Sequence, residues 1–166
     1  MKPGDHPEFF RWPPPEGTSR ESTLRLDRDG RFWHDGELVE RPRLSRAFHT
    51  WVGRHPDDGR PILTNGYDWC YLAVDDTLRF VASLGELDGS LWASLLDGRS
   101  MPIVPSSLQV DEEGVCFVRL RDDPDLARCK RVAMTQLEPW LVETSEGPAL
   151  AFGGALVPIR PRFETQ

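Results

Sequence analysis

The chain has 166 residues, 39% of them hydrophobic and 28% charged, which suits a globular protein of one compact domain or two small ones sharing a core. Its net charge is −7 and Arg is interleaved with Asp and Glu, so the basic patch of a nucleic-acid-binding protein is missing and we expect no nucleic-acid partner. No apolar run approaches the roughly 20 residues that span a bilayer, and no signal peptide opens the chain, so we expect a cytoplasmic protein without a membrane partner.

The first 21 residues are typical of an N-terminal arm. Residues 11–15 (RWPPP) predict extended backbone, because each proline fixes its own φ and disfavours helix before it. Such an arm either lies on the domain with its tryptophan packed down or offers a polyproline ligand to a partner. Two-residue alternation then predicts strands at 24–26 and 31–34, joined by a turn at 27–30.

A helix is predicted from Pro42, which is well suited to the first helical position, to about residue 52. Apolar residues recur on one side of it at Leu44, Ala47, Phe48, Trp51 and Val52. We therefore expect Leu44, Phe48 and Trp51 to be buried. His49 lies off this stripe and should be exposed.

A β-hairpin is predicted next, because Asn65-Gly66 lies between the apolar runs 60–64 and 67–74. Alternation along its second strand puts three aromatic residues on one face: Tyr67, Trp69 and Tyr71. Two interpretations of this face remain open. Either the helix covers it and it is core, or it lines a cleft where aromatic side chains meet a ligand.

The rest of the chain is predicted to contain more strands and a second helix. The strands fall at 78–84, 91–95, 101–104, 108–110, 115–120, 149–152 and 155–159. The helix lies within 131–143. Its start is left open, because Pro139 is costly inside a helix and Thr135 with Glu138 forms a capping box that favours a later start.

The two halves match in order, which indicates an internal repeat. Leu24-x-Leu26-Asp27-x-x-Gly30 parallels Leu108-x-Val110-Asp111-x-x-Gly114, Phe32 parallels Phe117, and Phe48-x-x-Trp51 parallels Leu137-x-x-Trp140. We predict an α+β fold of two tandem divergent strand-strand-helix-strand-strand motifs, with antiparallel, half-barrel-like sheets each covered by a helix. The predicted parts are the Pro-rich arm at 1–21, the first repeat at 22–85, a connecting hairpin at 86–105, and the second repeat with the C-terminal tail at 106–166.

Several short motifs, most of them between residues 31 and 82, are shared with one known family. They are Trp33-His34-x-Gly36, Val39-x-Arg41-Pro42-x-Leu44, Asp58-Gly59, Thr64, and Val74-Asp75-Asp76 ahead of Phe80. On these motifs the chain resembles the domain-of-unknown-function 1285 family of bacterial proteins, over roughly residues 24–160. The family tends to carry Thr-Pro-x-Glu at 64–67 and Val-Glu-Asp-Ala-Pro-Phe at 74–80, where this chain departs from it. The resemblance implies tandem α+β motifs without an established activity, and a role in signalling or ligand sensing.

The sequence lacks the motifs that carry common chemistry. Its four histidines have no metal-ligand spacing, and Asp27-x-Asp29-Gly30 places its glycine too early for a calcium loop. A G-x-S-x-G elbow and a glycine-rich phosphate loop are both missing. The three cysteines are scattered, and we expect them to be small hydrophobic groups in a reducing compartment. We therefore expect no metal and no cofactor.

The concentration of aromatic residues in the first half is the remaining candidate for a site. We predict a ligand or partner site formed by Trp33, His34, Thr64, Tyr67 and Asp75. A curled sheet would bring these side chains around a concave face, with His34 as the group that titrates near neutral pH. The expected function is a non-enzymatic module in bacterial signalling that senses a small molecule or binds a protein partner. The alternative is a small hydrolase or transferase with an unrecognised active site.

Overall fold

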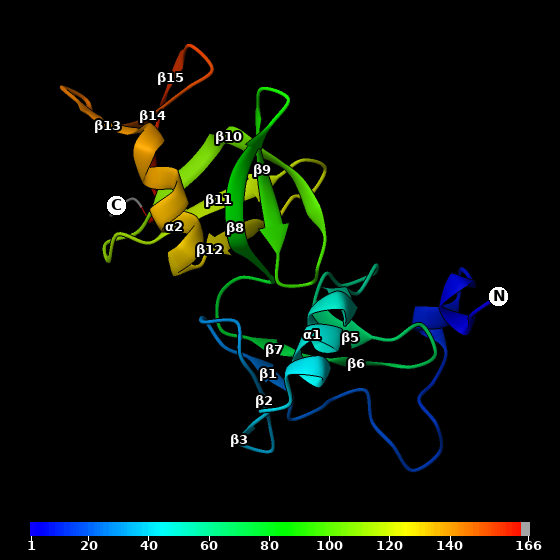
Figure 1. Cartoon of the computed structure of the whole chain (residues 1–166). Coiled ribbons are helices and arrows are strands. Elements are labelled where there is room, and N and C mark those ends of the chain that lie inside the picture. The colour runs from blue at the N-terminus through cyan, green and yellow to red at the C-terminus, as the bar shows by residue number, and fades with distance from the viewer. Residues whose placement is uncertain (164–166) are drawn as a thin grey trace. The chain divides into compact units, whose positions relative to one another are not determined.

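The computed structural model describes residues 1–163 of the chain (Figure 1). Its contacts divide the chain into two compact units, Met1–Leu78 and Arg79–Gln166. The described residues form two α-helices and many strands, so the predicted mixture of helix and sheet is confirmed. Among these residues, none of the helices has both the length and the apolar character needed to cross a membrane.

The first unit contains two small sheets and one α-helix after an N-terminal segment with two turns of 3-10 helix. Its elements are η1 (Pro3–Asp5), η2 (Phe9–Arg11), β1 (Arg25–Leu26), β2 (Phe32–His34), β3 (Glu37–Leu38), α1 (Pro42–Trp51), β4 (Val52–Arg54), β5 (Pro61–Thr64), β6 (Trp69–Tyr71) and β7 (Ala73–Val74). One sheet has the order β3-β2-β1-β7, in which β7 runs parallel to β1. The other is the antiparallel sheet β4-β5-β6.

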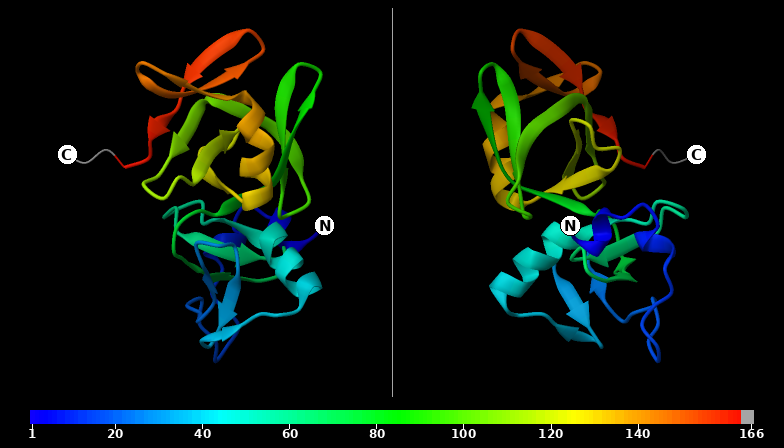
Figure 2. Two further views of the ribbon diagram at one scale, coloured as in Figure 1. Left: turned by 60° about the vertical axis from the view of Figure 1, so that its left-hand side comes forward. Right: turned by 90° about the vertical axis from the view of Figure 1, so that its right-hand side faces the viewer.

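The second unit is built around a closed barrel. Its elements are β8 (Arg79–Leu87), β9 (Ser90–Leu95), β10 (Ser100–Val110), β11 (Cys116–Leu120), β12 (Leu126–Cys129), α2 (Arg131–Leu137), η3 (Glu138–Trp140), β13 (Leu141–Thr144), β14 (Gly147–Phe152), β15 (Ala155–Pro158) and β16 (Arg160–Pro161). The strands β8 to β12 pair in the order β11-β12-β8-β9-β10, and β10 pairs with β11 to close the ring (Figure 2). The strands β13, β14 and β15 form a separate antiparallel sheet, and β16 adds parallel to β10.

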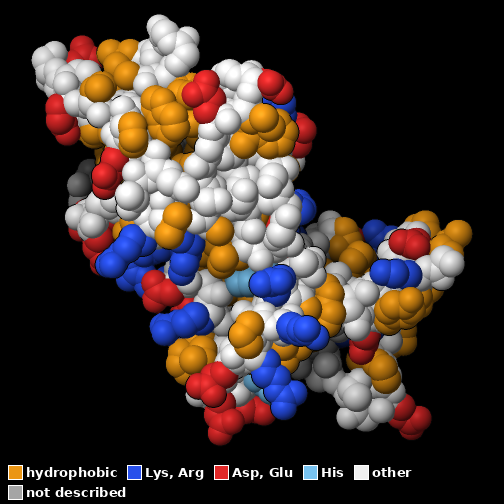
Figure 3. Space-filling view, in the orientation of Figure 1, with side chains coloured by type: hydrophobic (Ala, Val, Ile, Leu, Met, Phe, Trp, Pro, Cys, Tyr) orange, Lys and Arg blue, Asp and Glu red, His pale blue; other side chains and the backbone are white. Residues whose placement is uncertain are grey.

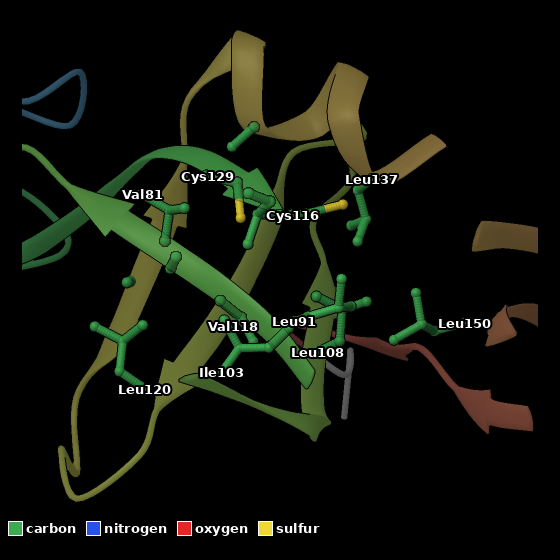
Figure 4. Close-up of a cluster of buried hydrophobic side chains, with 14 of the residues drawn as sticks. Val81, Leu91, Ile103, Leu108, Cys116, Val118, Leu120, Cys129, Leu137 and Leu150 are labelled. Carbon is green, nitrogen blue, oxygen red and sulfur yellow. The ribbon is translucent and has the colours of Figure 1, made fainter. Parts of the chain in front are cut away.

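The core of the second unit lies inside this barrel and under α2. Side chains from the barrel strands, among them Val81, Leu91 and Val118, point into one cluster with Leu137 of α2 (Figure 4). The hairpin predicted within residues 86–105 is present, because β9 and the first part of β10 pair antiparallel. Both strands are also part of the wall that closes the barrel.

Helix α1 begins at Pro42 as predicted, but the prediction of its buried face is wrong. Leu44 is 38% exposed, and Phe48 and Trp51 are only half-buried. The most buried residue of the helix is instead His49, which is 6% exposed. Its Nε2 lies 2.9 Å from the carbonyl oxygen of Gly30, and its ring meets that of Phe32 edge to face. A hydrogen bond and a ring contact thus bury a polar residue that apolar periodicity assigns to solvent.

Helix α2 begins at Arg131, which settles the start that the sequence left open. The α-helix ends at Leu137, and Pro139 falls in the following 3-10 turn η3. This placement avoids the cost of a proline inside an α-helix. In the first turn of η3 a backbone N–H would have no hydrogen-bond partner within that helix, so nothing is lost when proline lacks one.

Two residues of α2 that differ in burial give a stability test. Leu137 is fully buried, whereas Val132 is 58% exposed. Leu137→Ala leaves a cavity in the core, and we expect the free energy of unfolding to fall by about 2–5 kcal/mol. Val132→Ala, the matched control on the same helix, should change it by less than about 0.5 kcal/mol. Urea denaturation followed by circular dichroism measures both, and equal losses would contradict the placement of α2.

Candidate functional site

The predicted site residue Trp33 is held by a buried carboxylate. Asp27, 5% exposed, follows β1 and closes the turn to β2: its Oδ1 accepts hydrogen bonds from the backbone N–H groups of Asp29 and Arg31, both at 2.9 Å. Its Oδ2 accepts from the Trp33 indole Nε1 at 2.9 Å and from the Arg31 Nε at 3.0 Å. The carboxylate therefore fixes the turn with one oxygen and the tryptophan with the other.

Burial and hydrogen bonding oppose each other at Asp27. Removal from water alone would raise the pKa of its carboxyl group, because burial disfavours the charged form. The bonds donated by the Trp33 side chain, by the backbone of Arg31 and Asp29, and by the Arg31 side chain outweigh this and lower the pKa below its ordinary value. Asp27 is therefore ionised at neutral pH, and its charge is compensated inside the fold.

Asp75 is brought to the same sheet as Trp33 through Arg25. The backbone N–H of Asp75, just after β7, donates to the carbonyl oxygen of Leu26 at 3.0 Å, which continues the parallel pairing of β7 with β1. Its carboxylate accepts a hydrogen bond from Arg25. The Arg25 guanidinium also lies 5.3 Å from the ring centre of Trp33. One arginine thus contacts two of the five predicted residues.

His34 ends β2 beside an open hollow. Its side chain is 60% exposed, and its Nε2 lies 3.6 Å from the Asp35 carboxylate. The hollow, of about 510 Å³, lies between the β2–β3 hairpin and the start of α1. It is lined by His34, Glu37, Leu38, Val39, Glu40, Arg41 and Leu44. The helix periodicity predicted Leu44 to be buried, but this residue is exposed and forms an apolar part of the wall of the hollow.

Thr64 ends β5 of the other sheet and Tyr67 lies in the β5–β6 loop, where the predicted two-residue turn is wrong. Thr64 pairs with Trp69, so the loop has four residues instead of two. The Asn65 side chain explains this, because its Oδ1 accepts from the backbone N–H groups of Tyr67 and Asp68 and favours the wider loop. Tyr67 is 63% exposed. That all five predicted residues share one ligand stays a prediction, since they are distributed over the two sheets of the first unit.

The aromatic face of β6 is covered by the N-terminal segment, not by the helix. Phe9 is buried together with Ile62 and Trp69, and Phe10 packs against them. The segment is anchored by a backbone hydrogen bond from Gly4 to Gly66 at 2.7 Å. Trp12, which was expected to pack down, is 42% exposed. The pair of adjacent phenylalanines in the arm was the available signal for this contact.

A buried histidine fastens this segment and was missed by the sequence analysis. The Nε2 of His55 lies 3.1 Å from the carbonyl oxygen of Phe10, and its Nδ1 accepts from the backbone N–H of Asp57 at 3.1 Å. His55 is 7% exposed, and its ring packs on Trp69 and Tyr71. Both ring nitrogens thus form hydrogen bonds with backbone groups. No sequence motif marked it, because both partners come from the folded loop and arm.

Tyr71 is tied to charged neighbours at the edge of the same face. Its hydroxyl donates to Asp58 Oδ2 at 2.7 Å, and the Arg60 guanidinium lies 3.6 Å from its ring centre. Arg60 also makes two hydrogen bonds to the Glu21 carboxylate. The bond to Asp58 raises the pKa of Tyr71, and the backbone N–H of Arg60 leads the contacts that lower the pKa of Asp58. These shifts stabilise the neutral phenol and the ionised carboxylate.

The thiols and the metal-binding side chains show no reactive arrangement. Burial raises the pKa of Cys70, Cys116 and Cys129, so all three are neutral thiols at physiological pH. Within residues 1–163, His, Cys, Asp and Glu side chains nowhere gather in threes with the spacing of a metal site.

Comparison with known proteins shows a likeness of fold. No family model matches the chain, and no curated protein matches it. The crystal structure of a DUF1285 (domain-of-unknown-function 1285) family protein from Silicibacter pomeroyi DSS-3 matches with a TM-score of 0.64 and 20% identity, over 98% of this chain and 91% of that one. One from Shewanella baltica OS155 matches with a TM-score of 0.52 and 13% identity, over 68% of this chain and 87% of that one. The resemblance to this family is confirmed for the fold, which is all that such low identities support.

The role of Asp27 is tested by Asp27→Asn, which keeps the side chain's size but removes its charge. We expect the free energy of unfolding to fall by about 1–3 kcal/mol at pH 7. Because the folded-state pKa is below the ordinary value of 3.8, the ionised carboxylate stabilises the fold above that pH, and the stabilisation is lost as the pH falls through the folded-state value. The difference between variant and parent should therefore shrink on acidification.

Urea denaturation of both proteins between neutral and acidic pH measures this difference. Asp88→Asn is the control, because Asp88 is exposed and its positive φ of 51° suits asparagine equally well. A difference between Asp27→Asn and its parent that stays constant with pH would show that the Asp27 charge does not hold the turn.

Proposed function

We propose that this protein is a non-enzymatic module of bacterial signalling, acting in the cytoplasm, that senses a small ligand or binds a partner through its first unit. The hollow beside His34 carries this proposal. Its volume of about 510 Å³ falls in the range of ligand sites, and its wall combines apolar Leu38, Val39 and Leu44 with charged Glu37 and Arg41. The signalling role rests on the family resemblance alone.

The direction of the pKa shifts supports binding over catalysis. A hydrolase or transferase needs groups whose pKa values move toward neutrality, with opposed shifts in one pocket. In the first unit the shifts of the carboxyl, phenol and thiol groups run the other way: the pKa values of Asp27, Asp57 and Asp58 are lowered, and those of Tyr71 and Cys70 are raised. Such shifts keep carboxylates ionised and phenols and thiols neutral at pH 7, as structural groups require.

We also propose that the chain contains two divergent copies of one motif, one beginning at β1 and the other at β10. Their first turns support this. Oδ1 of Asp111 accepts hydrogen bonds from the backbone N–H groups of Glu113 and Val115, both at 2.9 Å. Oδ1 of Asp27 likewise accepts from the backbone N–H groups two and four residues further along the chain. Gly30 and Gly114 have positive φ at the same position of each turn, 88° and 82°.

The order of the following elements supports the same proposal. In each unit a helix is followed by three antiparallel strands, β4-β5-β6 or β13-β14-β15, and then by a short strand parallel to the first, β7 on β1 or β16 on β10. Strand register refines the alignment of the copies. Leu26 pairs with Phe32 in the first copy, and Val110 pairs with Cys116 in the second. By register, Cys116 therefore corresponds to Phe32, whereas the sequence alone aligned Phe32 with the next residue, Phe117.

A thermal-shift screen against nucleotides and acyl compounds tests the ligand-binding role. A ligand present at 100 times its dissociation constant should stabilise the folded protein by about 2.7 kcal/mol. Leu44→Ala, which removes an apolar wall of the hollow, should abolish most of this shift. Leu87→Ala is the matched control, because Leu87 is an exposed leucine outside the hollow.

Equal ligand shifts in Leu44→Ala and Leu87→Ala would contradict the assignment of the hollow. Mass spectrometry of the stabilising compound after incubation tests the non-enzymatic part of the proposal. The compound should be recovered unchanged, and its conversion to a product would favour a hydrolase or transferase.

A further inference from the structure

We propose that a second hollow, in the second unit, binds small organic cations of the quaternary ammonium class. The cation would lie against the rings of Trp140 and Phe152, with the carboxylate of Glu86 as its counter-ion. The site is separate from the hollow beside His34 and does not depend on the function proposed for that one.

The hollow combines aromatic walls with an open turn. It has a volume of about 470 Å³ and lies between η3 and the β14–β15 turn. The rings of Trp140 and Phe152 are 5.5 Å apart between centres and meet at 83°, so they form two walls of a corner. The turn itself is Gly153-Gly154, and a Cβ built on either glycine meets nothing within 4 Å. A turn without side chains thus leaves the corner accessible.

The charges around the corner favour a cation. Glu86 lines the hollow, and among residues 1–163 no hydrogen bond or ion pair engages its carboxylate. Residues 138–158 contain Glu138, Glu143 and Glu146 but no Lys or Arg. Figure 3 shows hydrophobic and acidic side chains together over β13–β15. Aromatic ring faces attract cations, and most strongly when the ring is that of tryptophan, so rings and carboxylate favour the same ligand.

The first unit contains a similar combination of aromatic ring and carboxylate, and there the cation is an arginine of the chain itself. A hollow of about 170 Å³ lies there beside Trp51 and the β5–β6 loop, and Asp68 and Trp69 line it. Arg20 pairs with the Asp68 carboxylate and lies 4.4 Å from the ring centre of Trp69. In the described part of the second unit, no Lys or Arg takes that place over the Trp140 or Phe152 ring. An external cation would complete the arrangement.

A comparison of choline with its uncharged isostere 3,3-dimethylbutan-1-ol tests the proposal. The two have nearly the same shape, so only a cation site distinguishes them. At constant ionic strength, choline should shift the indole N–H signal of Trp140 in a ¹⁵N-correlated NMR titration, and the alcohol should bind at least about tenfold more weakly. Equal binding of the two compounds would show an apolar hollow and overturn the proposal.

Two matched variants locate the effect at the corner. Glu86→Gln should weaken choline binding at least about tenfold, whereas Glu143→Gln, an exposed acid on β13 outside the hollow, should change it less than about twofold. Both positions are exposed, so neither substitution should impair folding, which circular dichroism would check. Unchanged binding in Glu86→Gln, or equal losses in the two variants, would overturn the proposal.

A quaternary ammonium group can belong to a free metabolite or to a lipid headgroup, and one further experiment distinguishes these two sources. Co-sedimentation of the protein with phosphatidylcholine vesicles, competed by choline and lost in Glu86→Gln, would identify a headgroup. Choline binding without vesicle binding would identify a free cation. Either result supports the proposed site, and failure of choline to bind overturns it whatever the vesicles show.

Discussion

The carboxylate of Asp27 is the contact on which the first unit's candidate site depends. One of its oxygens closes the turn between β1 and β2, and the other accepts from the Trp33 indole. Arg25 then spans from the Trp33 ring to the Asp75 carboxylate, so the turn, the tryptophan and the end of β7 form one connected network. An unpaired buried charge would destabilise the fold, whereas this one accepts enough hydrogen bonds to stay ionised.

The charged groups of the first unit mainly hold the chain together, and its open surfaces remain for binding. His55 and Tyr71 look like acid–base candidates by type, yet their polar atoms are engaged by the arm and by Asp58. By contrast, His34 and Glu86 are exposed beside hollows. The two hollows lie in separate units.

Local signals in the sequence predicted well what local physics decides. Pro42 marked the start of α1, and Gly153-Gly154 marked the turn between β14 and β15. The failures involve partners distant in the chain. His49 is buried because Gly30 offers it a carbonyl oxygen, and the second unit closes into a barrel because β10 pairs with β11, neither of which periodicity can show. For the same reason the sequence could not show that Thr64 belongs to a different sheet from Trp33, so a site shared by all five residues stays a prediction.

The most direct test of whether Asp27 holds Trp33 is the titration of the Asp27 carboxyl group by ¹³C NMR, with the Trp33 indole N–H signal followed in the same samples. We predict a pKa below the ordinary 3.8, and an indole signal that moves as the carboxylate is protonated, because the two groups share a hydrogen bond. A pKa at or above the ordinary value, or an indole signal indifferent to that titration, would show that Asp27 does not hold Trp33.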